Sequence, residues 1–296
     1  MEVLNSVPES ANVPELPMPV GRSDYPNYGG WAANIAWALE AFRQGTLDKV
    51  VLARKAVFDF GETIDPLALL RRLHRDAPSR FHFLVQPRRG KAFVGASPER
   101  LFCKHGRTML SEAVAGTRPR GDSEVSDAQL RTELLGSEKD QREHAFVRNE
   151  IQAALAPMTT ELDVETVASE MKLAKGRHLV SQVRGTLKDD VTGLDVLRTL
   201  HPTPAVGGTP RSAALDAIDR LEPFDRGLYA APVGWVSADD AEFAVAIRSG
   251  LIEGNTLALY SGAGIVDGSD ARSEWDEIEH KIIDFINVFG LDVRRA

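Results

Sequence analysis

Short apolar runs at irregular intervals constrain the fold of this chain more than any other feature of its sequence. Strand-like runs alternate only occasionally with helical patterns, whereas a parallel β/α array needs strand and helix in regular alternation. No Pro/Ser/Gly-rich linker divides residues 30–296, so we predict one continuous α+β domain there. Residues 1–29, rich in Pro, Asn, Ser and Gly, are predicted to form a loosely ordered arm.

The expected elements follow from hydrophobic spacing and from capping residues. The predicted helices cover residues 31–42, 65–77, 127–155, 211–221 and 269–288. The predicted strands cover residues 49–58, 81–86, 91–97, 100–103, 165–168, 178–186, 228–236, 242–249 and 256–260.

Composition narrows the class of protein. Hydrophobic residues make up 43% and charged residues 26% of the 296 residues, as in ordinary globular proteins, and the net charge of −8 argues against nucleic acid as a partner. No membrane span or secretory signal is apparent, and the lone Cys103 has no second cysteine to pair with. We expect a cytoplasmic protein, and a monomer because no extended apolar patch is apparent.

Two helical stretches carry paired carboxylates. Asp140 and Glu143 are three residues apart on one helix face, and Glu274 and Glu277 repeat the arrangement, with Lys281 one turn further on. Two such helices could share one Mg²⁺ ion, because magnesium prefers oxygen ligands and keeps waters in its remaining positions. Taken alone, each pair is more simply interpreted as a solvated helix face.

The glycine-rich run GAGIV at residues 262–266 also has two interpretations. A glycine turn before a helix can point backbone N–H groups at an anion, or it can be only a tight connection between strand and helix. No dinucleotide fingerprint or Walker sequence accompanies it, so nucleotide cofactors are not supported.

Isolated charged residues in strand patterns are the remaining candidates. Lys49 and Arg248 lie at or inside predicted strands, where a charge faces solvent, pairs with an acid or lines a pocket. Glu99, after the turn-like Ser97-Pro98, has the same alternatives, and His178 could be an ordinary core or surface histidine.

Nine segments, in this order, resemble the chorismate-binding enzymes and, among them, the isochorismate synthases of menaquinone and siderophore biosynthesis. The segments are KVVLARK, FVGASPERLF, SEAVAGTRPRG, SEKDQREHAFV, HLVSQVRGTL, LHPTPAVGGTP, EPFDRGLYAAPVGW, FAVAIRSG and LYSGAGIVDGSDARSEWDEIEHKI. The resemblance implies a single large domain, residues 30–296, with an extensive, mostly antiparallel β core flanked by helices. Members of the family often have a longer N-terminal portion.

The resemblance also implies a chemistry, the Mg²⁺-dependent, reversible conversion of chorismate to isochorismate. Lys49 matches the base that activates water for attack at ring carbon 2, and Glu99 matches the acid that protonates the departing hydroxyl at carbon 4. Lys49 must then act in its neutral form and Glu99 in its protonated form. Glu143 and Glu277 match the Mg²⁺ ligands.

Other site residues are assigned from the same resemblance. Asp140 and Glu274 match residues that support the metal ion through its bound waters. The substrate-binding positions are Tyr229 and Arg248 for the enolpyruvyl carboxylate, Gly262, Ala263, Gly264 and Lys281 for the ring carboxylate, and Thr117, His178 and Ala205 elsewhere in the pocket.

The subtype within the family depends on a few positions. Lys49 argues against the amine-forming members, because a base for water has little use when ammonia is the nucleophile. Ala115 replaces a lysine typical of aminodeoxychorismate synthases, and Ala205 replaces a threonine found in most other members. Two alternatives stay open: a salicylate synthase, which also eliminates pyruvate, and a catalytically silent subunit of the family.

Overall fold

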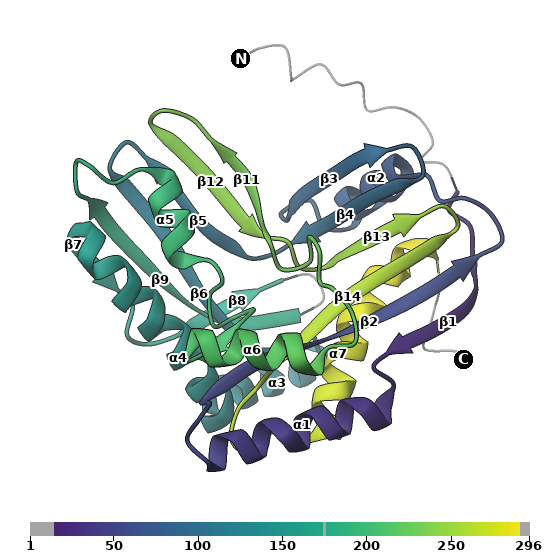
Figure 1. The fold of residues 1–296 in the computed structure, drawn as a ribbon, viewed down its shortest axis with the longest axis horizontal. Coiled ribbons are helices and arrows are strands. Elements are labelled where there is room, and N and C mark those ends of the chain that lie inside the picture. Colours follow the sequence, from purple (N-terminus) through teal and green to yellow (C-terminus); the bar gives the residue numbers. More distant parts are fainter. Residues whose placement is uncertain (1–14, 174–175, 291–296) are drawn as a thin grey trace.

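The computed structural model describes residues 15–173 and 176–290, and its strands form two sheets of seven strands each (Figure 1). The first sheet has the order β1-β2-β14-β13-β4-β3, with β10 also on β2, and the second the order β11-β12-β5-β6-β9-β7, with β8 also on β9. Every strand pairing in the described residues is antiparallel, which confirms the expected α+β class.

The strand bounds are as follows. The first sheet contains β1 (Pro19–Tyr25), β2 (Lys49–Phe60), β3 (Phe81–Arg88), β4 (Lys91–Ser97), β10 (Gly208–Thr209), β13 (Ser249–Glu253) and β14 (Thr256–Ile265). The second contains β5 (Arg100–His105), β6 (Thr108–Pro119), β7 (Thr159–Val164), β8 (Ser169–Lys172), β9 (Gly176–Leu187), β11 (Pro232–Val236) and β12 (Asp240–Val245).

Each sheet has its own set of helices (Figure 1). Against the first sheet and against one another pack α1 (Tyr28–Arg43), α2 (Pro66–Asp76), α6 (Arg211–Leu221) and α7 (Ala271–Ile286). Against the second pack α3 (Glu124–Gly136), α4 (Glu138–Leu155) and α5 (Gly193–Leu200). Two short 3₁₀ helices, Ala156–Met158 and Asn287–Phe289, follow α4 and α7.

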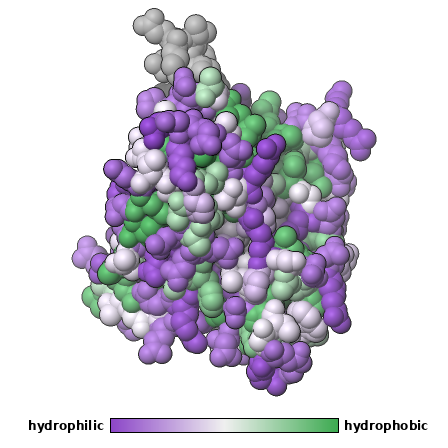
Figure 2. All heavy atoms as spheres, turned by 60° about the vertical axis from the view of Figure 1, so that its left-hand side comes forward, coloured by the Kyte–Doolittle hydropathy of each residue, from purple (hydrophilic) through white to green (hydrophobic). Residues whose placement is uncertain are grey.

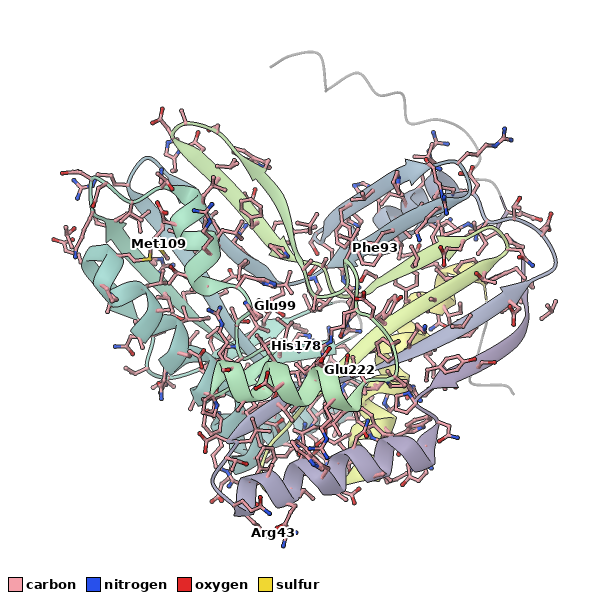
Figure 3. The ribbon with its side chains drawn as sticks, viewed as in Figure 1. Arg43, Phe93, Glu99, Met109, His178 and Glu222 are labelled. Carbon is pink, nitrogen blue, oxygen red and sulfur yellow. The ribbon has the colours of Figure 1, made fainter. Side chains whose placement is uncertain are left out.

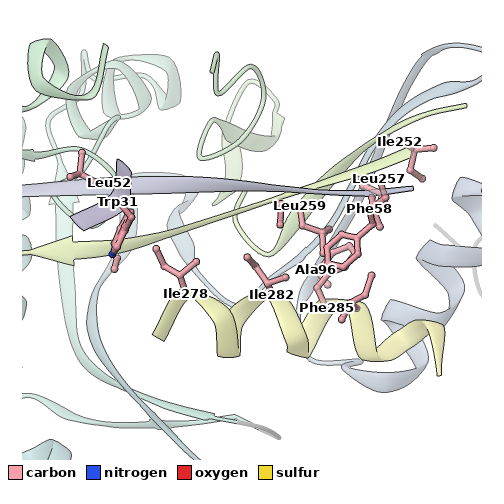
Figure 4. Close-up of a cluster of buried hydrophobic side chains, with 14 of the residues drawn as sticks. Trp31, Leu52, Phe58, Ala96, Ile252, Leu257, Leu259, Ile278, Ile282 and Phe285 are labelled. Carbon is pink, nitrogen blue, oxygen red and sulfur yellow. The ribbon is translucent and has the colours of Figure 1, made fainter. Parts of the chain in front are cut away.

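A first core fills the space between the first sheet and its helices (Figure 4). Side chains of a strand alternate between the two faces of its sheet. Leu52 of β2 and Leu259 of β14 therefore belong to this core, together with Trp31 of α1 and with Ile278 and Ile282 of α7. The opposite face of β2, which carries Lys49, is left for the interior of the molecule.

A second core lies under the second sheet and extends to that opposite face of the first. Val147 and Ile151 of α4 contribute to it together with strand residues such as Phe102. Ala53 of β2 and Tyr260 of β14 belong to the same cluster although they come from the first sheet. The two sheets are therefore packed together through the second core.

Of the places where the chain crosses between the sheets, two are adjacent. At the first of these it leaves the first sheet between β4 and β5, and at the second it returns to that sheet between β12 and β13. The crossings are joined by hydrogen bonds: Val245 N donates to Glu99 O at 3.1 Å, and Ala96 N donates to Arg248 O at 3.1 Å. The two crossings are thus held side by side where the sheets meet, with Glu99 on one and Arg248 on the other.

The single helix predicted over residues 127–155 is wrong: two helices, α3 and α4, occupy this stretch. They are separated by Ser137, whose φ of −76° and ψ of 112° are extended rather than helical. The Ser137 side chain accepts a hydrogen bond from Asp140 N and so caps the start of α4. The hydrogen bond of this cap stabilises a helix that begins after Ser137, although the hydrophobic spacing is helical on both sides of it.

Three strand predictions also need correction. The strand predicted over 242–249 covers the end of β12 and the first residue of β13, which belong to different sheets, and residues 246–248 between them form the crossing. Residues 165–168 form the connection between β7 and β8, not a strand, and the strand predicted over 228–236 begins only at Pro232. At Ala230 the backbone has a φ of 62°, which is incompatible with a strand.

The predicted N-terminal arm is also partly wrong. Residues 1–14 lie outside the described residues, but Pro19–Tyr25 forms β1, which pairs with β2 from Phe60 to Lys55. Backbone hydrogen bonds to a long strand edge override the low hydrophobicity of this segment.

The surface is mixed in character. On the face seen in Figure 2, hydrophobic residues occur in small groups separated by hydrophilic ones. Within the described ranges, no helix combines the length and hydrophobicity that crossing a membrane requires. The monomer stays a prediction.

Candidate active site

One pocket lies where the two sheets meet, near the two chain crossings, and most of the predicted site residues line it. Glu99 and His178 are seen in the middle of the molecule in Figure 3. The predicted residues that line this pocket are Glu99, Thr117, Glu143, His178, Ala205, Tyr229, Arg248, Gly262, Gly264, Glu277 and Lys281. Lys49, Asp140, Ala263 and Glu274 are not among the lining residues.

Lys49 lies directly behind the pocket wall. It is the first residue of β2, and its side chain is fully buried. Its Nζ is 3.2 Å from Oε1 of Glu143, and among the described residues it has no hydrogen-bond partner. A buried amine in contact with a pocket carboxylate is chemically suited to exchange a proton with a bound molecule.

Glu99 faces the pocket from the first chain crossing. Its backbone N–H donates to Ser97 Oγ at 3.2 Å, which fixes the turn that carries it. Burial raises the pKa of Glu99 to about 7, an effect that Lys49 opposes and Glu112 assists. A large share of Glu99 is therefore protonated at neutral pH, as a general acid requires.

Residues 262–264 do not form a turn, so both interpretations of the GAGIV run are wrong in this respect. They belong to β14 and pair with residues 51–53 of β2, from Gly262 opposite Ala53 to Gly264 opposite Val51. A Cβ on Gly264 would lie 2.0 Å from Oε1 of Glu143. Glycine is needed here because the Glu143 side chain occupies that space.

Alternation along β14 separates the three residues of this run. Gly262 and Gly264 line the pocket, whereas the side chain of Ala263 points into the first core and is 1% exposed. Only the backbone of Ala263 can therefore contact a bound molecule.

Two cationic side chains face the pocket. Arg248 lies at the second chain crossing, in the left-handed region with a φ of 50°. Lys281 of α7 donates to Gly262 O at 2.9 Å and to Glu277 Oε1 at 2.7 Å. They make this pocket a suitable place for an anionic molecule.

Tyr229 adds a hydroxyl to the same wall. Its ring stacks on Tyr260 with 5.4 Å between the centroids and 18° between the planes. Burial raises the pKa of Tyr229 to about 12, so it stays a neutral hydrogen-bond donor.

Thr117 of β6 and His178 of β9 form a hydrogen-bonded pair on the second sheet. A bulge at Gly116, with a φ of 69°, turns this part of β6 towards the pocket. Nδ1 of His178 is 3.0 Å from Thr117 Oγ1 and 3.1 Å from Gly116 O. Burial lowers the pKa of His178 to about 3, so the ring is neutral.

The four predicted metal-site carboxylates divide into two groups. Glu143 and Glu277 line the pocket from α4 and α7. Asp140 and Glu274 are buried outside the lining, where Asp140 accepts a 2.7 Å hydrogen bond from Arg118 and Glu274 forms an ion pair with Lys139. In the part of the chain that the structure describes, no three or more His, Cys, Asp or Glu side chains are clustered as metal ligands.

The pairing of these carboxylates with bases affects their ionisation. Burial and the neighbouring Glu277 raise the pKa of Glu274. For Glu277 burial acts in the same direction, but Lys281 and Lys139 outweigh it and the pKa is lowered. Glu277 is therefore the more readily ionised member of the pair.

Sequence reasoning missed several lining residues, including Val51, Val206, Ile247 and Tyr260. Tyr260 could have been found by alternation, because it shares a strand face with Gly262 and Gly264. The others carry no chemical signal, since they contribute only apolar surface.

Comparison with known proteins adds an independent finding. A family model described as "Chorismate binding enzyme" matches residues 2–290. Isochorismate synthase 2 of Arabidopsis thaliana is 41% identical over 269 residues, which cover 90% of this chain and 48% of that protein. Isochorismate synthase MenF of Bacillus subtilis is 40% identical over 261 residues, 88% of this chain and 55% of that protein.

A solved structure agrees in fold. MenF, described as the menaquinone-specific isochorismate synthase from Escherichia coli, superposes with a TM-score of 0.87 at 34% identity, over 94% of this chain and 65% of that one. The chain thus spans about half the length of the curated relatives that it matches.

Proposed function

We propose that this chain, which belongs to the chorismate binding enzyme family, is an isochorismate synthase that converts chorismate to isochorismate reversibly in the presence of Mg²⁺. The observation that carries the proposal is the position of two buried groups at one pocket: Glu99 lines it, and Lys49 lies behind its wall, 3.2 Å from the lining residue Glu143. Lys49 begins β2 and Glu99 lies on the connection from β4 to β5, and the pocket also holds cationic and carboxylate side chains.

The reaction needs a base and an acid on different parts of the substrate ring. Neutral Lys49 accepts a proton from water as the water oxygen bonds to ring carbon 2. The double bond shifts, the bond from carbon 4 to its hydroxyl breaks, and Glu99 gives that oxygen a proton so that it leaves as water. Atoms and charge balance, because one water enters and one leaves.

The cations of the pocket suit a substrate with two carboxylates. Arg248 can offer a bidentate grip to the enolpyruvyl carboxylate, with the Tyr229 hydroxyl as a second donor. Lys281, already at Gly262 O, is near enough to β14 to serve the ring carboxylate there. These contacts would fix which face of the ring meets Lys49.

Glu143 and Glu277 are the residues that would hold Mg²⁺. The donor set fits, because magnesium needs only one or two protein carboxylates and completes its shell with waters and substrate. The ion would offset the negative charge of the substrate carboxylate. Asp140 and Glu274 would support its waters from behind the lining.

The choice of water over ammonia as the nucleophile is supported by two small residues. Ala115 and Ala205 both line the pocket. Neither offers the lysine or threonine side chain that the resemblance associates with other members of the family.

The first experiment is to incubate the purified protein with chorismate and Mg²⁺, with an EDTA control, and to separate the products by chromatography. Isochorismate in equilibrium with chorismate, lost on chelation, is the expected result. Salicylate and pyruvate would assign the chain to the salicylate synthases instead. Absence of any product would favour a silent subunit.

The role of the base is tested with Lys49→Gln. Loss of a general acid or base lowers rates by about 10²- to 10⁴-fold, and we expect a loss in this range with an unchanged fold. Lys55→Gln on the same strand is the matched control, because Lys55 contacts the rings of Tyr25 and Phe224 rather than the pocket. Unchanged turnover of the Lys49 variant would exclude this residue as the base.

A further inference from the structure

One edge of β2 is left without a strand partner for a short stretch. On this edge β10 pairs with Lys49 and Val50, and β1 begins to pair only at Lys55. Between these two pairings, the backbone groups of Val51 and Ala53 that face this edge would be unsatisfied if nothing replaced the missing strand, and burying them without partners would be costly.

An ion pair from the chain after α6 occupies this gap. Glu222 Oε1 accepts a hydrogen bond from Ala53 N at 2.7 Å, and Arg226 Nη2 donates to Val51 O at 2.8 Å. Arg226 also binds the Glu222 carboxylate with both Nε, at 2.8 Å, and Nη2, at 2.5 Å. Figure 3 shows Glu222 in the interior of the molecule, close to the pocket region.

The same guanidinium holds a second segment. Arg226 Nη1 donates to Val206 O at 2.8 Å, and the neighbouring Gly207 O accepts from Val51 N at 2.7 Å. The Arg226 guanidinium also lies 5.7 Å from the centre of the Tyr229 ring. Arg226 therefore joins β2, residues 203–207 and the turn before β11.

All three joined segments supply pocket walls. Val51, Val206 and Tyr229 line the pocket, whereas Glu222 and Arg226 do not. The ion pair can thus influence a bound molecule only through the walls that it holds, and Ala205, next to Val206, moves with them.

We propose that the Glu222–Arg226 ion pair is a positioning device that sets the distance between β2 and the walls carrying Ala205 and Tyr229, and so fixes the substrate relative to Lys49. The inference rests on the proposed function for its effect on catalysis. The structural part of the inference does not depend on that function.

The test uses Arg226→Lys, which keeps the charge but loses the two-pronged geometry, and Arg226→Gln, which loses both. Glu222→Gln retains an acceptor for Ala53 N and should be the mildest. Arg43→Gln is the control, because Arg43 forms an exposed ion pair with Glu40 far from the pocket, at the end of α1 (Figure 3). Each variant is checked for a native unfolding midpoint before it is assayed.

Two measurements are made on each folded variant. Hydrogen exchange should show faster exchange of the Val51 and Ala53 amides and of residues 203–207 in Arg226→Gln. The KM for chorismate should rise about tenfold or more, with a smaller effect on kcat, and the pH profile should not move because Lys49 and Glu99 are intact. Arg226→Lys should recover only part of the loss.

The outcomes separate the two hypotheses. Wild-type exchange rates in Arg226→Gln would overturn the positioning role outright. Faster exchange with KM within twofold of wild type would overturn its link to the substrate. If the wild-type protein does not turn over chorismate, the proposed function fails, and exchange alone decides whether the ion pair holds the pocket walls.

Discussion

Glu99 is the residue whose chemistry is most sensitive to its surroundings. Burial favours its protonated form and raises its pKa to about 7. As an acid it acts only when protonated, so activity should be retained below this pKa and fall as pH rises through it. A pH profile of kcat/KM with a descending limb near 7 is expected, and a profile flat from pH 6 to 9 would contradict the role.

The same pKa has a consequence for stability. Because the folded-state pKa of Glu99 is raised above its unfolded value, the stability it contributes is present at low pH and is lost as pH rises through about 7. Glu99→Gln has no charge to bury. Between pH 5 and pH 8 the wild type should therefore lose about 2 kcal/mol relative to this variant, measured by urea unfolding. Parallel stability curves would show that Glu99 is not held in its protonated form.

Gly264 tests the space around the predicted metal ligand. A methyl group there would lie 2.0 Å from Glu143 Oε1 and 3.2 Å from Lys49 Cε, so Gly264→Ala must displace the Glu143 side chain. We expect the activity to fall about 100-fold and the Mg²⁺ concentration needed for half-maximal activity to rise. The loss of stability should be modest, because the displaced side chain is flexible. Gly61→Ala, where nothing lies within 4 Å of the added methyl group, is the control. An unchanged Mg²⁺ titration would argue against Glu143 as a ligand.

At the residue scale the sequence revealed reactive groups but not the backbone contacts that hold them. Lys49 and Glu99 were assigned from the family resemblance; Glu99 lines the pocket, and Lys49 is buried next to the lining residue Glu143. The Glu222–Arg226 pair was not found. Its spacing of four residues is that of an ordinary helix-surface pair, and its partners are backbone atoms of β2 about 170 positions earlier in the chain. Contacts from a side chain to a distant backbone leave no pattern in the sequence.

At the scale of elements, the metal-site residues depend on where α4 begins. Ser137 ends α3 and caps α4, and Asp140 and Glu143 lie in the first turns after it. The periodicity of residues 127–155 indicated one helix because a capping serine is compatible with both a continuous and a broken helix. The strand β6 was missed for a related reason, since its bulge between Ala115 and Thr117 interrupts the alternation.

Loss of this cap should affect the metal more than the fold. Ser137→Ala removes an acceptor for Asp140 N and should cost about 1 kcal/mol of stability, with a weakening of apparent Mg²⁺ affinity of about fivefold. Ser123→Ala removes the equivalent cap of α3, which carries no predicted site residue, and should cost a similar stability without changing Mg²⁺ affinity. Equal Mg²⁺ affinities in the two variants would contradict the link between the start of α4 and the metal site.

At the scale of the whole molecule, the pocket lies where two of the chain's crossings between the sheets, β4 to β5 and β12 to β13, run side by side. Glu99 and Arg248 sit on the two crossings, and their hydrogen-bonded neighbours hold the crossings together. The α+β class followed from the order of strand and helix patterns and the antiparallel core from the resemblance, but this juxtaposition followed from neither. Residues about 150 positions apart meet only through the order of strands in both sheets, which local patterns do not encode.

A molecule joined in this way should unfold as one unit, and substrate should stabilise both sheets equally. Its tryptophans allow each sheet to be followed: Trp31, Trp37 and Trp275 lie on helices of the first sheet, and Trp235 lies on β11 of the second. Trp235 is 53% exposed, so Trp235→Phe should be well tolerated. The difference in tryptophan fluorescence between this variant and the parent protein then reports the unfolding of the second sheet.

In urea at 25 °C, with Lys49→Gln as the parent protein to prevent turnover, both signals should share one midpoint. Chorismate with Mg²⁺ at about 100 times its Kd adds about 2.7 kcal/mol and should raise that midpoint by about 1 M. Chorismate with EDTA should raise it less. If only one signal moved, the sheets would be separate folding units, and a pocket shared between them could not hold Lys49 and Glu99 in fixed relation to one substrate.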